Sequence, residues 1–216
     1  MEYILCIETS GQFCSVAIKK EGIVYSEQSL EPMNHVEAIA ELIQVLFNDS
    51  NILFKELKAV AISDGPGSYT GLRIGASTAK GLCVALDIPL ISLSTLESLA
   101  TEAKKQYEAD VYWPMIDARR MEVYEAKFDQ NLKQLTEINN LIISDLGNYF
   151  EGGKKIVVCG DGAFKMQQFK PFKILELHQN AIYLIPLAEE KYIKKSYPQL
   201  ENYEPNYFKS ANITVA

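Results

Sequence analysis

Hydrophobic positions along the chain change their spacing after the first thirty residues, and this change outlines the expected elements. Three short apolar segments separated by turn residues predict an antiparallel meander, and helical spacing then alternates with continuous apolar runs. The predicted strands are residues 3–8, 14–19, 23–29, 57–63 and 89–93. The predicted helices begin near residue 34 and span residues 71–86 and 95–105. The mixture indicates an α/β fold, and the order βββαβαβα matches a ribonuclease-H-like sheet.

The apolar pattern lapses around residues 104–110 and then starts again. The later pattern predicts paired strands at residues 111–118 and 121–128, strands at 155–160 and near 172–177, a short helical stretch after Gly162 and a helix near 181–195. A strand pair that restarts halfway along the chain suggests a degraded duplication of the first sheet. We therefore expect an N-terminal lobe at residues 1–105 and a smaller, similar C-terminal lobe at residues 106–216.

The first two predicted helices each carry more apolar surface than packing against one sheet requires. The earlier helix is expected to begin with a capping box of Asn34 and Glu37. Its predicted core face comprises Val36, Ile39, Ala40, Ile43, Leu46 and Phe47, and a second apolar stripe comprises Ala38, Leu42 and Val45. In the later helix the core face comprises Leu72, Ala76, Ala79, Cys83 and Leu86, and the opposite stripe comprises Ile74, Thr78, Gly81 and Ala85.

These surplus stripes predict a surface on which another helix pair docks. Small residues let a second helix approach closely, and an exposed apolar patch marks an interaction site. The predicted partner-binding residues are Ala38, Leu42, Val45, Ile74, Thr78, Gly81 and Ala85. The alternative is that the second lobe or the C-terminal helix of the same chain covers these stripes.

Composition narrows the classes of function. With 216 residues, 48% of them hydrophobic, and a net charge of −7, the chain lacks the basic surface that lets a protein grip nucleic acid by itself. Four cysteines without C-x-x-C spacing predict reduced core thiols rather than disulfides or zinc. The absence of a membrane-length apolar run and of a basic leader predicts a cytoplasmic protein.

A glycine-rich loop, SDGPGSYTGLRIG at residues 63–75, stands between a predicted strand and a predicted helix, the position of a phosphate-binding loop. The alternative interpretation is structural. Gly65, Pro66 and Gly67 would form a rigid strand-to-helix turn, and Ser68 or Thr70 would cap the helix that follows.

Two enzymatic interpretations follow from the expected sheet. A two-metal nuclease would use acids at strand ends and on the first helix, namely Glu8, Glu37 or Glu41, and Asp64. Against it, the chain is acidic and Asp64 suits a turn. An actin-like or sugar-kinase-like ATPase would instead wrap phosphates with two hairpins. The first, ETSGQFC, keeps small residues, whereas the second, IDARRMEVY, has Arg119 and Arg120 at its turn and no glycine.

Several motifs together resemble one family. They are ILCIETS, GPGSYTGLRIG, LSTLESLA, IDARRMEVY, CGDGA and EPNYFK, in this order and over nearly the whole chain. The chain is thereby similar to the TsaB (YeaZ) family, whose members resemble the larger TsaD (Kae1) subunits. The resemblance implies a bilobal ASKHA fold, that is, actin-like and sugar-kinase-like.

The resemblance also implies that one metal site is missing. TsaD-like subunits place two histidines four apart in a segment that here reads STLESL, where Thr95 and Leu99 occupy the histidine positions. Neither side chain is a good metal ligand, and His35 and His178 lie far apart in sequence. No H-E-x-x-H motif supports the older glycoprotease interpretation. We therefore expect no metal and no cofactor.

The function that the resemblance implies is a non-catalytic subunit, a pseudoenzyme that dimerises with TsaD and activates it. The modification is N6-threonylcarbamoyladenosine (t6A), made beside the anticodon of tRNAs that read codons beginning with A. TsaE, an ATPase, is the expected third component, and a homodimer is expected when TsaD is missing. tRNA would be met only indirectly, through the complex.

Overall fold

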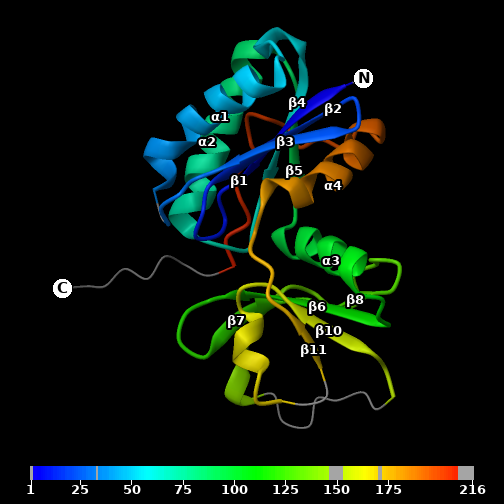
Figure 1. Ribbon diagram of the computed structural model, residues 1–216. Helices are drawn as coiled ribbons and strands as arrows, with labels where there is room; N and C mark the ends of the chain where they lie inside the picture. The colour runs from blue at the N-terminus through cyan, green and yellow to red at the C-terminus, as the bar shows by residue number, and fades with distance from the viewer. Residues whose placement is uncertain (1, 33, 146–152, 170–171, 209–216) are drawn as a thin grey trace, which may run out of the picture.

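The computed structural model describes residues 2–32, 34–145, 153–169 and 172–208, which form two sheets one above the other (Figure 1). The first sheet has the strand order β3-β2-β1-β4-β5, in which β1 is antiparallel to β2 and parallel to β4. Its strands are β1 (Tyr3–Glu8), β2 (Ser15–Lys20), β3 (Ile23–Gln28), β4 (Leu57–Ser63) and β5 (Leu90–Leu93). This is the predicted ribonuclease-H-like arrangement.

Helices cover both faces of the first sheet. In β1 the side chains alternate, so Leu5 and Ile7 join the core beneath one helix pair, whereas Ile4 and Cys6 join the core on the other face. The helix pair is α1 (His35–Ser50) and α2 (Tyr69–Leu86), and the opposite face is covered by α4 (Ala181–Ile193). The central strands β1 and β4 are buried on both faces, which explains why they are continuous apolar runs, whereas the edge strand β3 is largely exposed.

The second sheet repeats the topology of the first. Its order is β11-β10-β6-β7-β9, with β6 antiparallel to β7 and parallel to β10. The strands are β6 (Val111–Asp117), β7 (Glu122–Glu125), β9 (Asn139–Ile142), β10 (Ile156–Cys159) and β11 (Lys173–Leu175), and β8 (Phe128–Asp129) pairs with β6. Short 3-10 turns are η1 (Phe54–Glu56), η2 (Ile143–Asp145) and η3 (Ala163–Met166). The predicted duplication is confirmed by this matching order.

Two helices pack away from the sheets nearest to them in sequence. The helix α3 (Thr95–Gln106) follows β5 but packs on β6 and β10 of the second sheet. The helix α4 follows the second sheet but packs on the first, and residues 200–203 lie against the core of that sheet as well. Each of these helices thus packs on the sheet of the other predicted lobe (Figure 1). The lobe boundary at residue 105 therefore stays a prediction.

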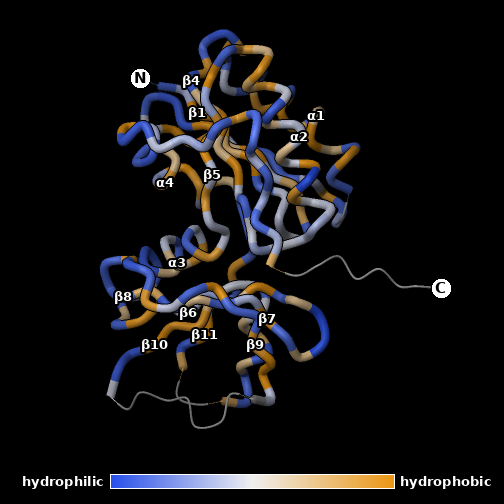
Figure 2. The backbone as a smooth tube through the Cα atoms, turned by 180° about the vertical axis from the view of Figure 1, so that it is seen from behind, coloured by the Kyte–Doolittle hydropathy of each residue, from blue (hydrophilic) through white to orange (hydrophobic). Residues whose placement is uncertain are grey.

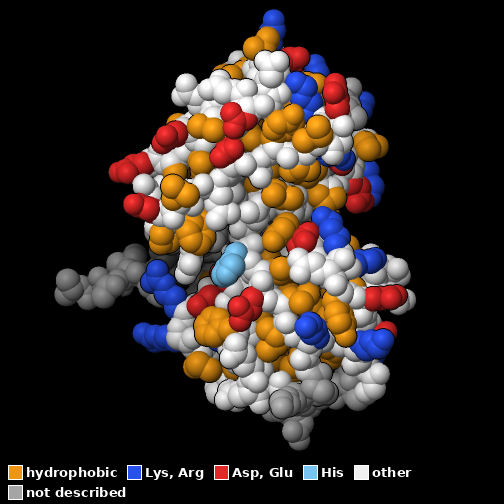
Figure 3. All heavy atoms as spheres, viewed as in Figure 1, with side chains coloured by type: hydrophobic (Ala, Val, Ile, Leu, Met, Phe, Trp, Pro, Cys, Tyr) orange, Lys and Arg blue, Asp and Glu red, His pale blue; other side chains and the backbone are white. Residues whose placement is uncertain are grey.

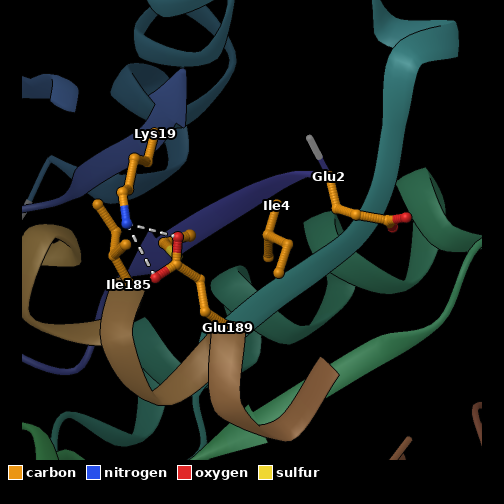
Figure 4. A pocket seen from close by; sticks show the side chains of 6 residues that line it. Glu2, Ile4, Lys19, Ile185 and Glu189 are labelled. Atoms are coloured by element: carbon orange, nitrogen blue, oxygen red, sulfur yellow. Dashed lines mark hydrogen bonds and ion pairs between the residues drawn. The ribbon is translucent and has the colours of Figure 1, made fainter. Parts of the chain in front are cut away.

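A small polar contact fixes one end of α4 to the first sheet. Lys19 on β2 donates to both carboxylate oxygens of Glu189 at 2.9 and 3.1 Å, beside Ile4 and Ile185 (Figure 4). The hollow next to this pair has a volume of about 10 Å³, room for about one water molecule. Because both charged groups are partly exposed, we expect this ion pair to contribute less to stability than the apolar packing around it. None of the helices in the described residues is long and apolar enough to cross a membrane.

The orientation of α1 differs from the prediction. Val36 is 70% exposed and Ala40 is exposed, whereas His35, which was not predicted for the core face, is buried; Leu46 is buried as predicted. The His35 ring turns inward, where its Nε2 lies 3.1 Å from the carbonyl oxygen of Gly11. A helical wheel cannot predict this contact, because it considers the residues of one helix alone. The predicted capping box is also wrong, because Asn34 makes no side-chain capping hydrogen bond.

Candidate docking face and polar junction

The helices α1 and α2 form an open groove on the surface of the first lobe. Its volume is about 440 Å³. The lining residues are Val36, Ile39, Tyr69, Thr70, Arg73, Ile74, Ser77 and Thr78. Apolar residues recur along both helices (Figure 2). We call the outer surface of these two helices, with this groove, the α1–α2 face.

All seven predicted partner-binding residues lie on the α1–α2 face with some surface accessible. Gly81 and Ala85 are exposed, whereas the half-buried ones are Ala38, Leu42, Val45, Ile74 and Thr78. A methyl group built on Gly81 meets no atom within 4 Å. Val84, which is 71% exposed on the same helix, was not among the predicted residues. Because α4 packs on the opposite side of the sheet, that helix does not cover this face.

The glycine-rich loop packs against the first hairpin instead of standing open. The N–H of Ser68 donates to the carbonyl oxygen of Ser10 at 2.7 Å, and the Ser68 hydroxyl accepts the Gly71 N–H at 3.2 Å, which caps α2. Gly71 and Gly75 both lie against Thr9 so closely that an added methyl group would clash. The glycines therefore allow α2 to approach the turn that follows β1, and two loop amides are already used.

A buried carboxyl group supports that turn from β1. Glu8 is fully buried, and its Oε1 accepts the Ser10 N–H and the Ser63 hydroxyl, each at 2.6 Å. The other oxygen, Oε2, has no partner among the described residues. Burial raises the pKa of Glu8, while the hydrogen bonds from Ser10 and Ser63 act in the opposite direction.

The equivalent hairpin of the second sheet is supported by an ionic network. Lys165, whose side chain is 5% exposed, donates to Asp117 Oδ1 at 2.6 Å and to the carbonyl oxygen of Glu122 at 2.8 Å. The N–H of Asp117 donates to Asp161 Oδ1 at 3.0 Å. Burial raises the pKa of Asp161. Gln179 lies between the two hairpins, because its side chain is against Gly11 and next to Asp161.

The C-terminal segment runs past the start of α2. Tyr203 is buried in the first core, and Lys80 donates to its carbonyl oxygen at 3.2 Å. Asn206 donates its backbone N–H to the carbonyl oxygen of Asp64 at 2.8 Å and its side chain to Asp64 Oδ2 at 3.1 Å. This function of the EPNYFK motif was missed, because no local pattern shows which strand end a distant loop will meet. The last motif residue, Lys209, lies outside the described residues.

The acids of the nuclease interpretation do not form one site. Glu37 and Glu41 are exposed on α1, while Glu8 is enclosed between Ser10 and Ser63. Asp64 is tied to Asn206, and burial raises its pKa to about 6. Within the part of the chain that the structure describes, no three His, Cys, Asp or Glu side chains are grouped to hold a metal ion. Both positions of the missing histidines, Thr95 and Leu99, are fully buried.

Two sheets with the same strand order, each with an antiparallel hairpin in the same position, define an ASKHA-type protein. Residues 20–195 match the family model described as TsaD, tRNA N6-adenosine threonylcarbamoyltransferase. A Buchnera aphidicola protein named tRNA threonylcarbamoyladenosine biosynthesis protein TsaB is 31% identical, over 86% of this chain and 92% of the relative. The relative of the same name from Haemophilus influenzae is 29% identical over 96% and 93%. The chain belongs to the TsaB family, within the wider group that the TsaD model describes.

Solved structures agree with this family. YeaZ from Pseudomonas aeruginosa superposes with a TM-score of 0.84 at 25% identity, covering 96% of this chain and all of the other. A second Pseudomonas aeruginosa structure, of a protein described as similar to the peptidase YEAZ, gives a TM-score of 0.86 at 25% identity over 97% of this chain and all of the other.

The chain was predicted to be a pseudoenzyme subunit and not an enzyme. These comparisons contradict that prediction. One structural relative is described by its similarity to a peptidase, the sequence relatives are named biosynthesis proteins, and none is described as a pseudoenzyme. The prediction rested on the missing histidines at Thr95 and Leu99. Their loss removes one metal site, yet buried carboxyl groups with raised pKa values, Glu8 and Asp161, remain at the junction.

Proposed function

We propose that this chain acts in the biosynthesis of N6-threonylcarbamoyladenosine in tRNA, and that it does so by pairing with a TsaD-type subunit through the α1–α2 face. The single observation that carries the proposal is that this face is apolar and grooved, with Gly81 and Ala85 exposed on it. Monomeric proteins rarely leave such a surface without a partner.

A TsaD-type subunit fits this face because it is related to the chain itself. The chain matches the TsaD family model over residues 20–195, and a Bacillus thuringiensis tRNA N6-adenosine threonylcarbamoyltransferase is 32% identical over 42% of this chain and 31% of the relative. A related subunit is expected to carry its own equivalents of α1 and α2. Two similar helix pairs then meet in a four-helix contact about a pseudo-two-fold axis.

The geometry of this face supports one finer proposal, and the family resemblance supports two more. In the absence of TsaD, a second copy of this chain presents an identical α1–α2 face, so a homodimer forms through it. Pairing by TsaB orders or activates TsaD, and a TsaE-type ATPase joins the pair as a third component. These statements come from the family to which the chain belongs.

Size-exclusion chromatography with light scattering tests the pairing directly. The purified chain is mixed with the TsaD-type subunit of the same organism, and a 1:1 complex is expected to replace the homodimer. Addition of that complex, and not of either subunit alone, is expected to produce t6A in unmodified tRNA when the remaining pathway components are supplied. Subunits that stay separate at micromolar concentration would contradict the proposal.

A further inference from the structure

The turn between β6 and β7 has an unusual backbone for its residues. Arg119 and Arg120 both adopt left-handed conformations, with φ of 68° and 50°. Glycine and asparagine are the residues that adopt this conformation at little cost, because their side chains do not crowd the backbone. Two consecutive arginines in it are therefore kept for their side chains rather than for the ease of making the turn.

The surrounding structure holds the turn in this conformation. The Arg119 N–H donates to Asp117 Oδ1 at 2.6 Å, and the Glu122 N–H donates to the carbonyl oxygen of Arg119 at 3.1 Å. Lys165 joins Asp117 to the carbonyl oxygen of Glu122 from the buried side. The hairpin is thus fixed from beneath, and its two guanidinium groups are presented to solvent.

Arginine is scarce elsewhere in the chain. Of 21 basic residues only three are arginine, and two of those stand at this turn. Both are exposed, and within the described residues neither has an ion-pair partner. A guanidinium group binds a phosphate with two parallel hydrogen bonds, whereas a lysine ammonium acts as a point charge. Figure 3 shows basic side chains projecting at the edge of the molecule over the β6–β7 hairpin.

Exposed aromatic rings lie beside this hairpin. Phe208 packs against Tyr124 of β7 with ring centroids 6.3 Å apart, and Tyr207 packs against Tyr69 of α2 at 4.7 Å. Phe208 and Tyr207 are each 39% exposed. Tyr124 is four residues from Arg120, roughly 13 Å along a strand, so a ligand that spans several nucleotides reaches both the rings and the guanidinium groups.

We propose that Arg119 and Arg120, together with the rings of Tyr207 and Phe208, form a direct contact for a single-stranded segment of RNA, with the guanidinium groups on phosphates and the rings stacked on bases. This inference deepens the proposed function, on which it rests for the identity of the RNA as tRNA. Alternating phosphates and bases match a surface of guanidinium groups and rings. The two arginines and Phe208 lie outside the groove between α1 and α2, whereas Tyr207 packs against Tyr69 at the edge of that groove, so the RNA contact adjoins the α1–α2 face.

Fluorescence anisotropy with a labelled, unmodified tRNA anticodon stem-loop tests the contact, using the complex with the TsaD-type subunit at several salt concentrations. The double variant Arg119→Asn/Arg120→Gly supplies residues that suit left-handed positions, so its thermal midpoint is expected to be unchanged or higher. Its affinity is expected to fall about tenfold, and the slope of log K against log salt to decrease by about 1.4, the value for two lost phosphate contacts on a single strand.

Two further variants separate the components of the contact. Phe208→Ala is expected to weaken binding about tenfold without changing the salt slope, because stacking releases no counterions. The control Lys55→Gln/Lys58→Gln removes two exposed charges, one in η1 and one at the start of β4. It is expected to change neither the affinity for RNA nor the salt slope.

Three results would overturn the inference. In the first, the arginine variant has the same RNA affinity and salt slope as the lysine control. In the second, the arginine variant binds RNA normally but no longer assembles with the TsaD-type subunit. In the third, the arginine variant loses affinity for a labelled nucleoside triphosphate and keeps its affinity for RNA. If the two subunits do not assemble at all, the proposed function fails, and the same titration with the lone chain at low salt still tests the RNA contact.

Discussion

Three glycines of α2 have different surroundings, although the sequence presents them alike. A methyl group on Gly71 would lie 2.0 Å from the carbonyl oxygen of Thr9, and one on Gly75 would lie 2.3 Å from the Thr9 hydroxyl. At Gly81 the same group meets open space. The first two glycines serve the fold of this chain, whereas no contact within the described residues explains the third.

Substitution by alanine separates these roles. Gly81→Ala is expected to raise the free energy of unfolding by about 0.5–1 kcal/mol, because alanine favours a helix interior. Gly71→Ala is expected to lower it by about 3 kcal/mol, because the clash is with a backbone atom that cannot move aside. Urea unfolding of the dilute chain measures both. A destabilised Gly81→Ala would show that residue 81 has an intramolecular role.

Asp64 gives the stability a specific dependence on pH. Burial raises its pKa from 3.8 to about 6, against the charge of Lys191. Because the folded chain holds this proton more tightly than the unfolded chain, the contribution of Asp64 is largest below pH 4 and is lost as the pH rises to about 6. In Asp64→Asn this loss is absent, so the difference in unfolding free energy between the two proteins is expected to change between pH 4 and 6 and to be constant above. Urea unfolding at pH 4, 5, 6 and 7 measures it, and a constant difference across the whole range would contradict the assignment.

At the scale of elements, α1 and α2 each have an inner apolar face and an outer one, and Leu42 and Ile74 of the outer stripes also pack against the core. The inner faces, including Ile43 on α1 and Ala79 on α2, fill the core over the first sheet. The outer faces carry the predicted contacts and the groove between the helices. This division predicts that association and folding respond to different substitutions.

Charge on the outer face is expected to prevent association. Val45→Arg or Ala85→Glu would bury an unpaired charge at a helix contact and weaken the homodimer and the TsaD complex by about 100-fold or more. The matched control Ile193→Glu places a charge on α4, where the side chain is 79% exposed and remote from this face. Light scattering measures assembly, and thermal melting of the monomer is expected to be unchanged. Normal assembly of both variants would place the interface elsewhere, and a collapsed monomer would show that the stripes belong to the core.

At the scale of the whole molecule, charge sets the affinity for RNA. The net charge of −7 opposes a polyanion, and the proposed contact at the β6–β7 turn supplies two arginines only. The lone chain is therefore expected to bind tRNA with a Kd weaker than about 10 µM at physiological salt, and the partner subunit to supply the remaining contacts. Filter binding with and without the TsaD-type subunit measures this. Tight, salt-sensitive binding by the lone chain would show that the partner is not needed for RNA recognition.

Local patterns in the sequence predicted the first sheet and most of the second, but they missed β9 (Asn139–Ile142) and merged β7 and β8 into one strand. The apolar runs of β1 and β4 and the spacing of Leu72, Ala76 and Ala79 depend on burial by near neighbours, so periodicity alone predicted them. The restarted strand pair predicted the second sheet for the same reason. The motifs, spread over nearly the whole chain, were sufficient to indicate the family.

Tertiary structure alone decided how distant segments meet. Which sheet α3 and α4 cover, that Thr9 lies on Gly71, and that Asn206 reaches Asp64 all depend on contacts between residues far apart in sequence, which no local period encodes. The contact of the buried His35 with Gly11 likewise depends on a residue 24 positions away in the sequence. Raised pKa values and the left-handed arginines also arise only in the folded chain, because burial and the network under the β6–β7 turn exist only there.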